Sequence, residues 1–64
     1  MTEIEIWRTA YLMLRWYGST AREESARRAD EFAAAGDPAG EAGWRRVIGA
    51  IGQLASTAPP GPLH

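Results

Sequence analysis

The sequence predicts an all-α protein, a compact three-helix bundle, and the prediction rests on three observations. Apolar residues recur three or four positions apart in three segments. Each segment is preceded by a residue that caps helix starts. Gly18 and Gly36 separate the segments and fit the position just past a helix end. Because the connections are short, neighbouring helices are expected to run antiparallel. We expect helices near residues 3–17, 21–35 and 38–55, forming one domain over 1–55, followed by an extended proline-rich tail over 56–64.

The first segment begins with a capping box, in which Thr2 is followed three residues later by Glu5. Its periodicity predicts one wide apolar face toward the core. That face is expected to hold Ile4, Trp7, Tyr11 and Leu14, aligned with Ala10 and flanked by Ile6, Met13 and Tyr17. The opposite face is polar and holds Glu5, Arg8, Thr9 and Arg15.

Two apolar residues of this segment, Leu12 and Trp16, fall among its polar positions. They are four residues apart, so they are neighbours on the helix surface. With Arg8 and Arg15 beside them, the pair has the composition of a small binding hot spot, which is rich in aromatic residues and arginine. The alternative is that the pair is covered, either by the last helix or by Pro59 and Pro60 of the tail.

The second segment has a charged outer face and a thin packing face. Thr20 followed three residues later by Glu23 predicts a second capping box. The packing face consists mostly of small residues, namely Ala21, Ser25, Ala29, Phe32 and Ala33. On the outer face, Glu23–Arg27 and Glu24–Arg28 are spaced for ion pairs of about 0.2–0.5 kcal/mol each. We interpret this charged run as a solvated face.

The third segment starts with Asp37 before Pro38, an N-cap acid followed by proline at the first helical position. Its expected packing face consists of Trp44, Val47, Ile48, Ile51, Leu54 and Ala55. Gly49 and Gly52 each cost a helix interior about 1 kcal/mol relative to alanine. They mark either a close approach to this helix or tolerance of its surface.

A chain of 64 residues forms one small domain with a marginal core, worth about 3–5 kcal/mol. Seven residues are expected to supply most of that core: Trp7, Tyr11, Leu14, Phe32, Trp44, Ile48 and Ile51. A second copy would be a natural supplement, so a homodimer is one expectation. The N-terminus has no secretory leader, and no apolar run reaches the about 20 residues of a membrane span. We therefore expect a cytoplasmic protein that does not enter the membrane.

The residue types argue against enzymatic chemistry, a metal site or a cofactor. There is no cysteine, and the single histidine is the last residue, His64. Ser19, Thr20 and Ser25 have no histidine beside them to act as a general base. Adjacent carboxylates such as Glu23–Glu24 diverge on a helix and do not converge on an ion. We expect no catalytic residue, no metal ligand, no cofactor and no small-molecule substrate.

A set of motifs covers nearly the whole chain except the tail. They are Ile6-Trp7-x-Thr9-Ala10-x-Leu12, Arg15-x-Tyr17-Gly18, Ala26-x-Arg28-Ala29-Asp30-Glu31 and Gly36-Asp37-x-x-Gly40-x-x-x-Trp44-x-Arg46-Val47-x-x-Ala50-Ile51. With these motifs the chain resembles a family of small helical proteins of unknown function from proteobacterial genomes and prophages. Gly49 and Gly52 depart from that family's last helix. The resemblance implies no activity and no residue role.

Two function hypotheses follow. The first is a non-enzymatic interaction module that occupies a surface of a larger protein or complex, or of a second copy, through Leu12 and Trp16, with Arg8 and Arg15 at the rim. A phage-type inhibitor of a host defence complex, similar to an anti-CRISPR protein, is a special case of it. The alternative is a small DNA-binding regulator that uses Arg45 and Arg46. Because the net charge is −1 and acids are interleaved with the arginines, protein binding is favoured over nucleic acid.

Overall fold

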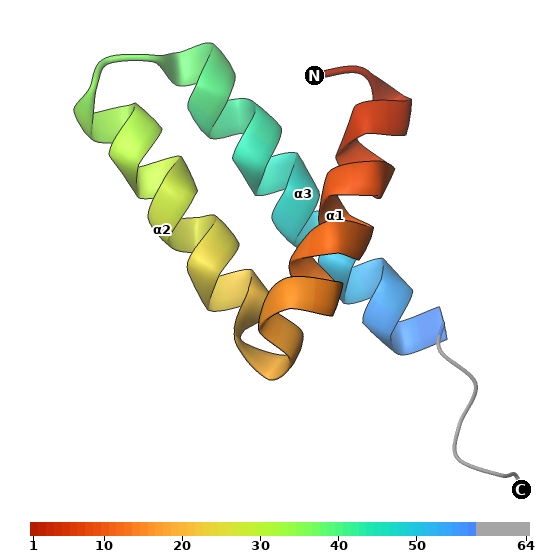
Figure 1. Ribbon diagram of the computed structural model, residues 1–64. Helices are drawn as coiled ribbons and strands as arrows, with labels where there is room; N and C mark the ends of the chain where they lie inside the picture. Colours follow the sequence, from red (N-terminus) through yellow and green to blue (C-terminus); the bar gives the residue numbers. More distant parts are fainter. Residues whose placement is uncertain (58–64) are drawn as a thin grey trace, which may run out of the picture.

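The computed structural model describes residues 1–57, and in that part of the chain the fold is all-helical, as predicted. The elements are α1 (Glu3–Tyr17), the 3-10 turn η1 (Gly18–Thr20), α2 (Ala21–Ala34) and α3 (Pro38–Thr57) (Figure 1). The first predicted range is matched, α2 ends just before its predicted limit, and α3 continues beyond residue 55 into the predicted tail. The remaining tail positions, with the suggested cover from Pro59 and Pro60, lie outside the described residues.

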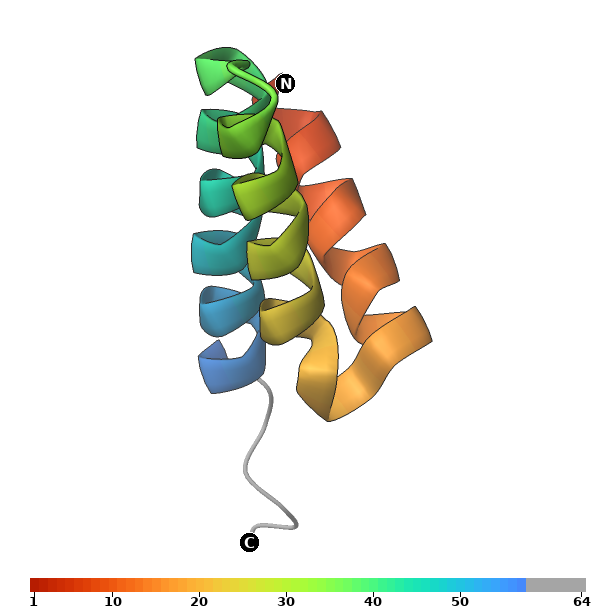
Figure 2. The same cartoon turned by 90° about the vertical axis from the view of Figure 1, so that its left-hand side faces the viewer.

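The long helix α3 packs more extensively against α1 and α2 than these two pack against each other. α2 and α3 lie side by side and antiparallel, while α1 packs across α3 and touches α2 less extensively (Figures 1 and 2). One broad side of α1 is therefore left without a neighbour among residues 1–57. This arrangement determines which side chains of α1 remain available.

The predicted cap at the start of α1 is confirmed. The Glu5 backbone N–H donates to the Thr2 hydroxyl oxygen at 3.2 Å, and the Thr2 backbone N–H donates to the Glu5 carboxylate at 2.9 Å. At the start of α3, the Gly40 backbone N–H donates to an Asp37 carboxylate oxygen at 3.0 Å, so the predicted acid cap is also confirmed. Both caps satisfy backbone donors that a helix start leaves unpaired.

The capping box predicted at Thr20 is wrong. Thr20 lies inside η1, its side chain caps nothing, and its hydroxyl donates to the Tyr17 carbonyl oxygen at 2.9 Å instead. The chain passes from α1 through η1 into α2, so the first turn of α2 is not a free helix start that needs a side-chain cap. Gly18 makes this passage possible with a positive φ of 54°, which other residues rarely adopt.

The core consists largely of small residues. Its largest fully buried side chains are Met13, Val47 and Ile51, joined by Ile6. The remaining buried positions are all small residues: Ala10, Ala21, Ala29, Ala50, Ser25 and Gly43. Small side chains let the helix backbones approach closely and still fill the space between them. The predicted thin face of α2 is confirmed in its first two-thirds, at Ala21, Ser25 and Ala29.

Two of the seven predicted core residues are wrong. Tyr11 is 55% exposed and Phe32 is 37% exposed, whereas Ile51 is buried and the other four are partly buried. For Tyr11 the reason is the rotation of α1, which turns Ile6, Ala10 and Met13 toward α3 and the Tyr11 side outward. Phe32 lies near the end of α2, where its ring covers the backbone of Gly40 rather than entering the core.

The glycines of α3 divide into two kinds. A Cβ added at Gly40 would clash with the Phe32 ring, and one at Gly43 would lie 3.1 Å from the Met1 sulfur. A Cβ at Gly49 would meet nothing within 4 Å, and one at Gly52 would be at ordinary contact distance from Arg22, 3.8 Å. Other side chains therefore approach the helix closely at Gly40 and Gly43, whereas at Gly49 and Gly52 the surface has room for a larger residue.

Candidate functional site

One face of α1 turns away from the rest of the molecule and combines apolar with basic side chains. Ile4, Arg8, Tyr11 and Arg15 are spaced by four, three and four residues, so they form a single stripe. This stripe lies opposite the buried line of Ile6, Ala10 and Met13, and all four residues are exposed. We call the stripe, together with Trp16 at its edge, the outer face of α1.

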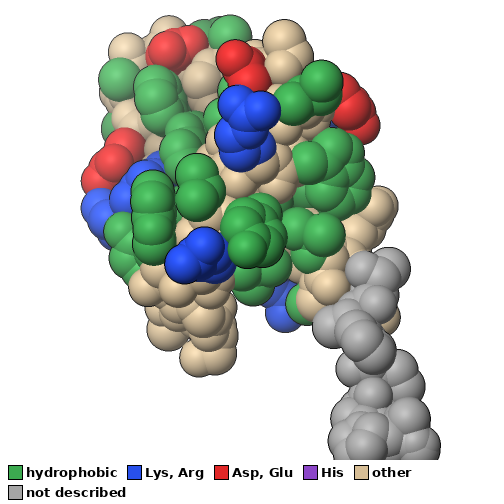
Figure 3. All heavy atoms as spheres, turned by 45° about the vertical axis from the view of Figure 1, so that its right-hand side comes forward, with side chains coloured by type: hydrophobic (Ala, Val, Ile, Leu, Met, Phe, Trp, Pro, Cys, Tyr) green, Lys and Arg blue, Asp and Glu red, His purple; other side chains and the backbone are tan. Residues whose placement is uncertain are grey.

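The apolar members of the outer face of α1 are strongly exposed. Ile4 is 69% exposed, Tyr11 is 55% exposed and Trp16 is 66% exposed. Figure 3, which brings the α1 side of the molecule forward, shows hydrophobic side chains gathered there with single basic side chains between them. Large apolar side chains clustered on a surface are typical of interaction sites, whereas scattered ones are not informative.

The two arginines of the outer face are not neutralised by carboxylates. Arg8 and Arg15 take part in none of the ion pairs among residues 1–57. Arg15 instead places its guanidinium over the Tyr11 ring, 6.0 Å from the ring centre. This cation–π contact leaves the guanidinium donors free for another acceptor.

The predicted pair of Leu12 and Trp16 is divided by the structure. Trp16 is exposed, as predicted, but Leu12 is partly buried. The exposed apolar surface is instead extended by Ile4 and Tyr11, which sequence reasoning placed in the core. A signal was present, because Arg8 and Arg15 alternate with Ile4 and Tyr11 along one stripe, a pattern that suits a surface better than a core.

The arginines of the alternative hypothesis, Arg45 and Arg46, are both paired with acids. Arg45 contacts Glu41 at 2.9 Å and Asp30 of α2 at 3.5 Å. Arg46 contacts Glu3 of α1 at 2.8 Å. Both side chains are exposed, but their charges are compensated by carboxylates from two other helices as well as from α3 itself.

The charged run on α2 forms ion pairs, though not all of those predicted. Glu24 and Arg28 pair at 3.7 Å, as the spacing suggested, whereas Arg27 pairs with Glu24 and with Glu31 rather than with Glu23. The hydrogen bond to Glu24 raises the pKa of the Arg27 guanidinium, and the charge of Glu31 adds to the effect. This charge pattern is that of a solvated, self-compensated face.

Arg28 links all the helices at one side of the molecule. Its guanidinium donates to the Tyr17 hydroxyl at 3.0 Å and lies over the rings of Tyr17 and Trp44, 5.8 Å and 5.3 Å from their centres. Only about a third of the Arg28 side chain is exposed. We assign this cluster to packing, since its donors and ring faces already have partners.

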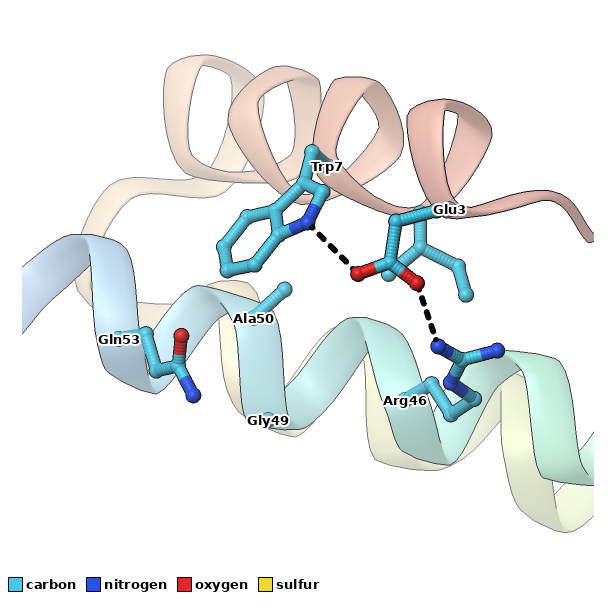
Figure 4. A pocket seen from close by; sticks show the side chains of 7 residues that line it. Glu3, Trp7, Arg46, Gly49, Ala50 and Gln53 are labelled. Carbon is cyan, nitrogen blue, oxygen red and sulfur yellow. Dashed lines mark hydrogen bonds and ion pairs between the residues drawn. The ribbon is translucent and has the colours of Figure 1, made fainter.

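A shallow pocket of about 230 Å³ lies between α1 and α3. Figure 4 shows Trp7 and Glu3 reaching down from α1, and Arg46 rising from α3 to meet Glu3. The Trp7 indole N–H donates to one Glu3 oxygen at 3.3 Å, while Arg46 binds the other. Gly49 and Ala50 form the floor. The polar groups of the wall satisfy one another, so the pocket does not present a converging set of unpaired groups.

The described residues contain no cluster of side chains suited to metal binding. Among them there is no group of three His, Cys, Asp or Glu side chains that would hold an ion. The hydroxyl of Ser25 is fully buried without a hydrogen-bond partner, and it faces the packed interior rather than a pocket. Within residues 1–57, no helix is both long enough and apolar enough to cross a membrane.

Comparisons of the chain with protein-family models, with curated proteins and with solved structures gave no match. The resemblance described from the sequence motifs therefore stays a prediction.

Proposed function

We propose that this protein is a non-enzymatic interaction module that acts by occupying a surface of another protein, and that it binds through the outer face of α1. The observation that supports the proposal is the exposure of Ile4, Tyr11 and Trp16 on one side of one helix, with two uncompensated arginines between them. Aromatic residues and arginine are the residue types that contribute most to protein interfaces.

The outer face of α1 is small compared with a typical stable interface. α1 has 15 residues and is therefore about 22 Å long. A single helix face of that length buries less than the about 800 Å² per partner of a typical stable interface. The affinity must then come from a few well-packed anchors, of which Trp16 and Tyr11 are the largest.

We do not extend the proposal to nucleic acid. Arg45 and Arg46 are held by Glu41, Asp30 and Glu3, so phosphate contacts would first have to break these pairs. Binding to a nucleic-acid backbone also depends on a patch of one sign.

Site-specific photo-crosslinking in the cells that naturally make the protein tests the proposal. The photoreactive residue benzoylphenylalanine replaces Tyr11 or Trp16 in two variants. The matched control carries it in place of Glu23, an exposed residue of α2 that takes part in none of the described ion pairs. Covalent adducts are separated on denaturing gels and identified by mass spectrometry.

We expect the Tyr11 and Trp16 variants to give the same discrete adduct and the Glu23 variant to give none. An adduct of twice the chain mass identifies a second copy as the partner, and an adduct of another mass identifies a foreign protein. The proposal is wrong if neither α1 position gives an adduct, or if all three positions give the same adducts.

A further inference from the structure

The charges of the molecule are distributed unevenly between α1 and the other helices. Four of the seven arginines are paired with carboxylates, namely Arg27, Arg28, Arg45 and Arg46. The other three, Arg8, Arg15 and Arg22, are not among the described ion pairs, and two of these three, Arg8 and Arg15, lie together on the outer face of α1. The nearest acid along that face is Glu5, whose carboxylate already accepts the Thr2 backbone N–H. The face is therefore locally positive although the chain carries a net charge of −1.

The spacing of Arg8 and Arg15 matches a partner helix whose charged residues recur at a regular interval. Seven residues separate Arg8 from Arg15, which places them two helical turns, or about 10.5 Å, apart along one side. Tyr11 lies between them and Ile4 lies one turn before Arg8. A helix that repeats carboxylates every seven residues beside an apolar stripe would match this alternation, with each carboxylate accepting from one guanidinium.

We propose that the partner of the outer face of α1 is an acidic amphipathic helix of another protein. This inference rests on the proposed function and adds the chemistry of the partner to it. The apolar stripe of the partner packs on Ile4, Tyr11 and Trp16. Its carboxylates, two turns apart, pair with Arg8 and Arg15. The attraction between opposite charges selects acidic helices over basic ones and fixes their register.

A second copy of the chain satisfies this chemistry less well. Two outer faces packed together would bring four arginines into one interface, against two Glu5 carboxylates that serve as cap acceptors. An anionic polymer such as duplex DNA also fits less well, because two arginines provide few phosphate contacts and the apolar side chains would remain exposed.

The test uses two synthetic helical peptides of about 15 residues, which share an apolar stripe of leucines and differ only in their charged positions. One carries glutamates seven residues apart and the other carries lysines there. Each is titrated into the nitrogen-15-labelled full chain, and amide chemical shifts report where and how tightly it binds. A short mixed-sequence DNA duplex and a dilution series of the chain alone are measured in parallel.

We expect the glutamate peptide to shift amides of α1 and the lysine peptide to leave them unchanged. The variant R8Q/R15Q weakens binding of the glutamate peptide about tenfold. The single variants R8Q and R15Q each weaken it to a smaller extent, whereas the matched single variant R22Q, which removes one arginine charge from α2 away from the face, leaves the affinity unchanged. None of these variants alters a core side chain, so all remain folded.

The inference is overturned if both peptides bind equally, if neither binds at about 1 mM, or if the shifts lie outside α1. It is also overturned if dilution or the duplex shifts the α1 amides while the glutamate peptide does not. Should the peptide fail while crosslinking at Tyr11 and Trp16 still captures one protein, the inference fails and the proposed function stands. If crosslinking fails as well, both are wrong.

Discussion

At the scale of single residues, small side chains set how closely α3 approaches its neighbours. Ala10, Ala29 and Ala50 are buried where the helices meet, and Gly40 brings the backbone of α3 against the Phe32 ring. At each of these positions a small residue contributes little apolar volume but lets the helix backbones pack closely. Stability at such sites therefore depends on the space beside the Cβ rather than on hydrophobicity.

Alanine substitutions at two glycines of α3 test whether stability depends on the space beside the Cβ. G49A places a methyl group in open space, so the gain in helix propensity of about 0.5–1 kcal/mol raises the free energy of unfolding. G40A has less to gain in the first turn of the helix, and its methyl group displaces the Phe32 ring at a cost of about 1–3 kcal/mol. We expect G49A to be more stable than the wild type and G40A to be less stable in urea unfolding followed by circular dichroism. Equal stabilisation by both would contradict the close contact at Gly40.

At the scale of the helices, the residue at which a helix starts is determined by its near neighbours in the sequence. The side of a helix that is buried depends instead on the helices that pack against it. Thr2 with Glu5, and Asp37 with Pro38, are capping signals that act within a few residues, so the helix starts at Glu3 and Pro38 could be predicted. The rotation of α1 depends on what α3 presents to it. Composition favoured the side with Trp7 and Tyr11, whereas close packing of α3 favours the side with Ala10, and nothing local distinguishes the two.

The same reasoning explains the wrong capping box at Thr20. The pattern Thr20-x-x-Glu23 is a capping signal only if the chain before it is not helical. Here α1 passes into η1, so the geometry around Thr20 is already helical and its hydroxyl turns back to the Tyr17 carbonyl. The exposed site on α1 was predictable in part, through Trp16, Arg8 and Arg15, because charged side chains remain in water and Trp16 falls among them along the helix.

The caps can be compared directly. D37A removes the acceptor of the Gly40 backbone N–H, and we expect it to lower the free energy of unfolding by about 0.5–2 kcal/mol. T20A removes an exposed hydroxyl that caps no helix, so its effect stays within about 0.5 kcal/mol. Thermal unfolding monitored by circular dichroism measures both. A loss at T20A as large as that at D37A would show that Thr20 is a cap after all.

At the scale of the whole molecule, the two sides of α1 differ: the apolar residues of one side are buried and those of the other side are exposed. One side contributes Ile6, Ala10 and Met13 to a core of small residues. The other side holds large apolar residues that the described part of the chain leaves exposed. Placing large apolar side chains outside while alanines fill the interior is unfavourable for a protein that functions alone, and it is expected for one that uses a partner to cover that side.

The central claim is that the outer face of α1 is free surface with no structural role, and one unfolding measurement tests it most directly. The triple variant I4Q/Y11Q/W16Q replaces the three apolar side chains of the face with glutamine, which is a good helix former. The variant M13A removes a core side chain from the other side of the same helix. The account predicts that the triple variant keeps its free energy of unfolding in urea within about 1 kcal/mol of the wild type, whereas M13A loses about 2–5 kcal/mol. A triple variant that loses as much as M13A would contradict the account, since its side chains would then belong to the core.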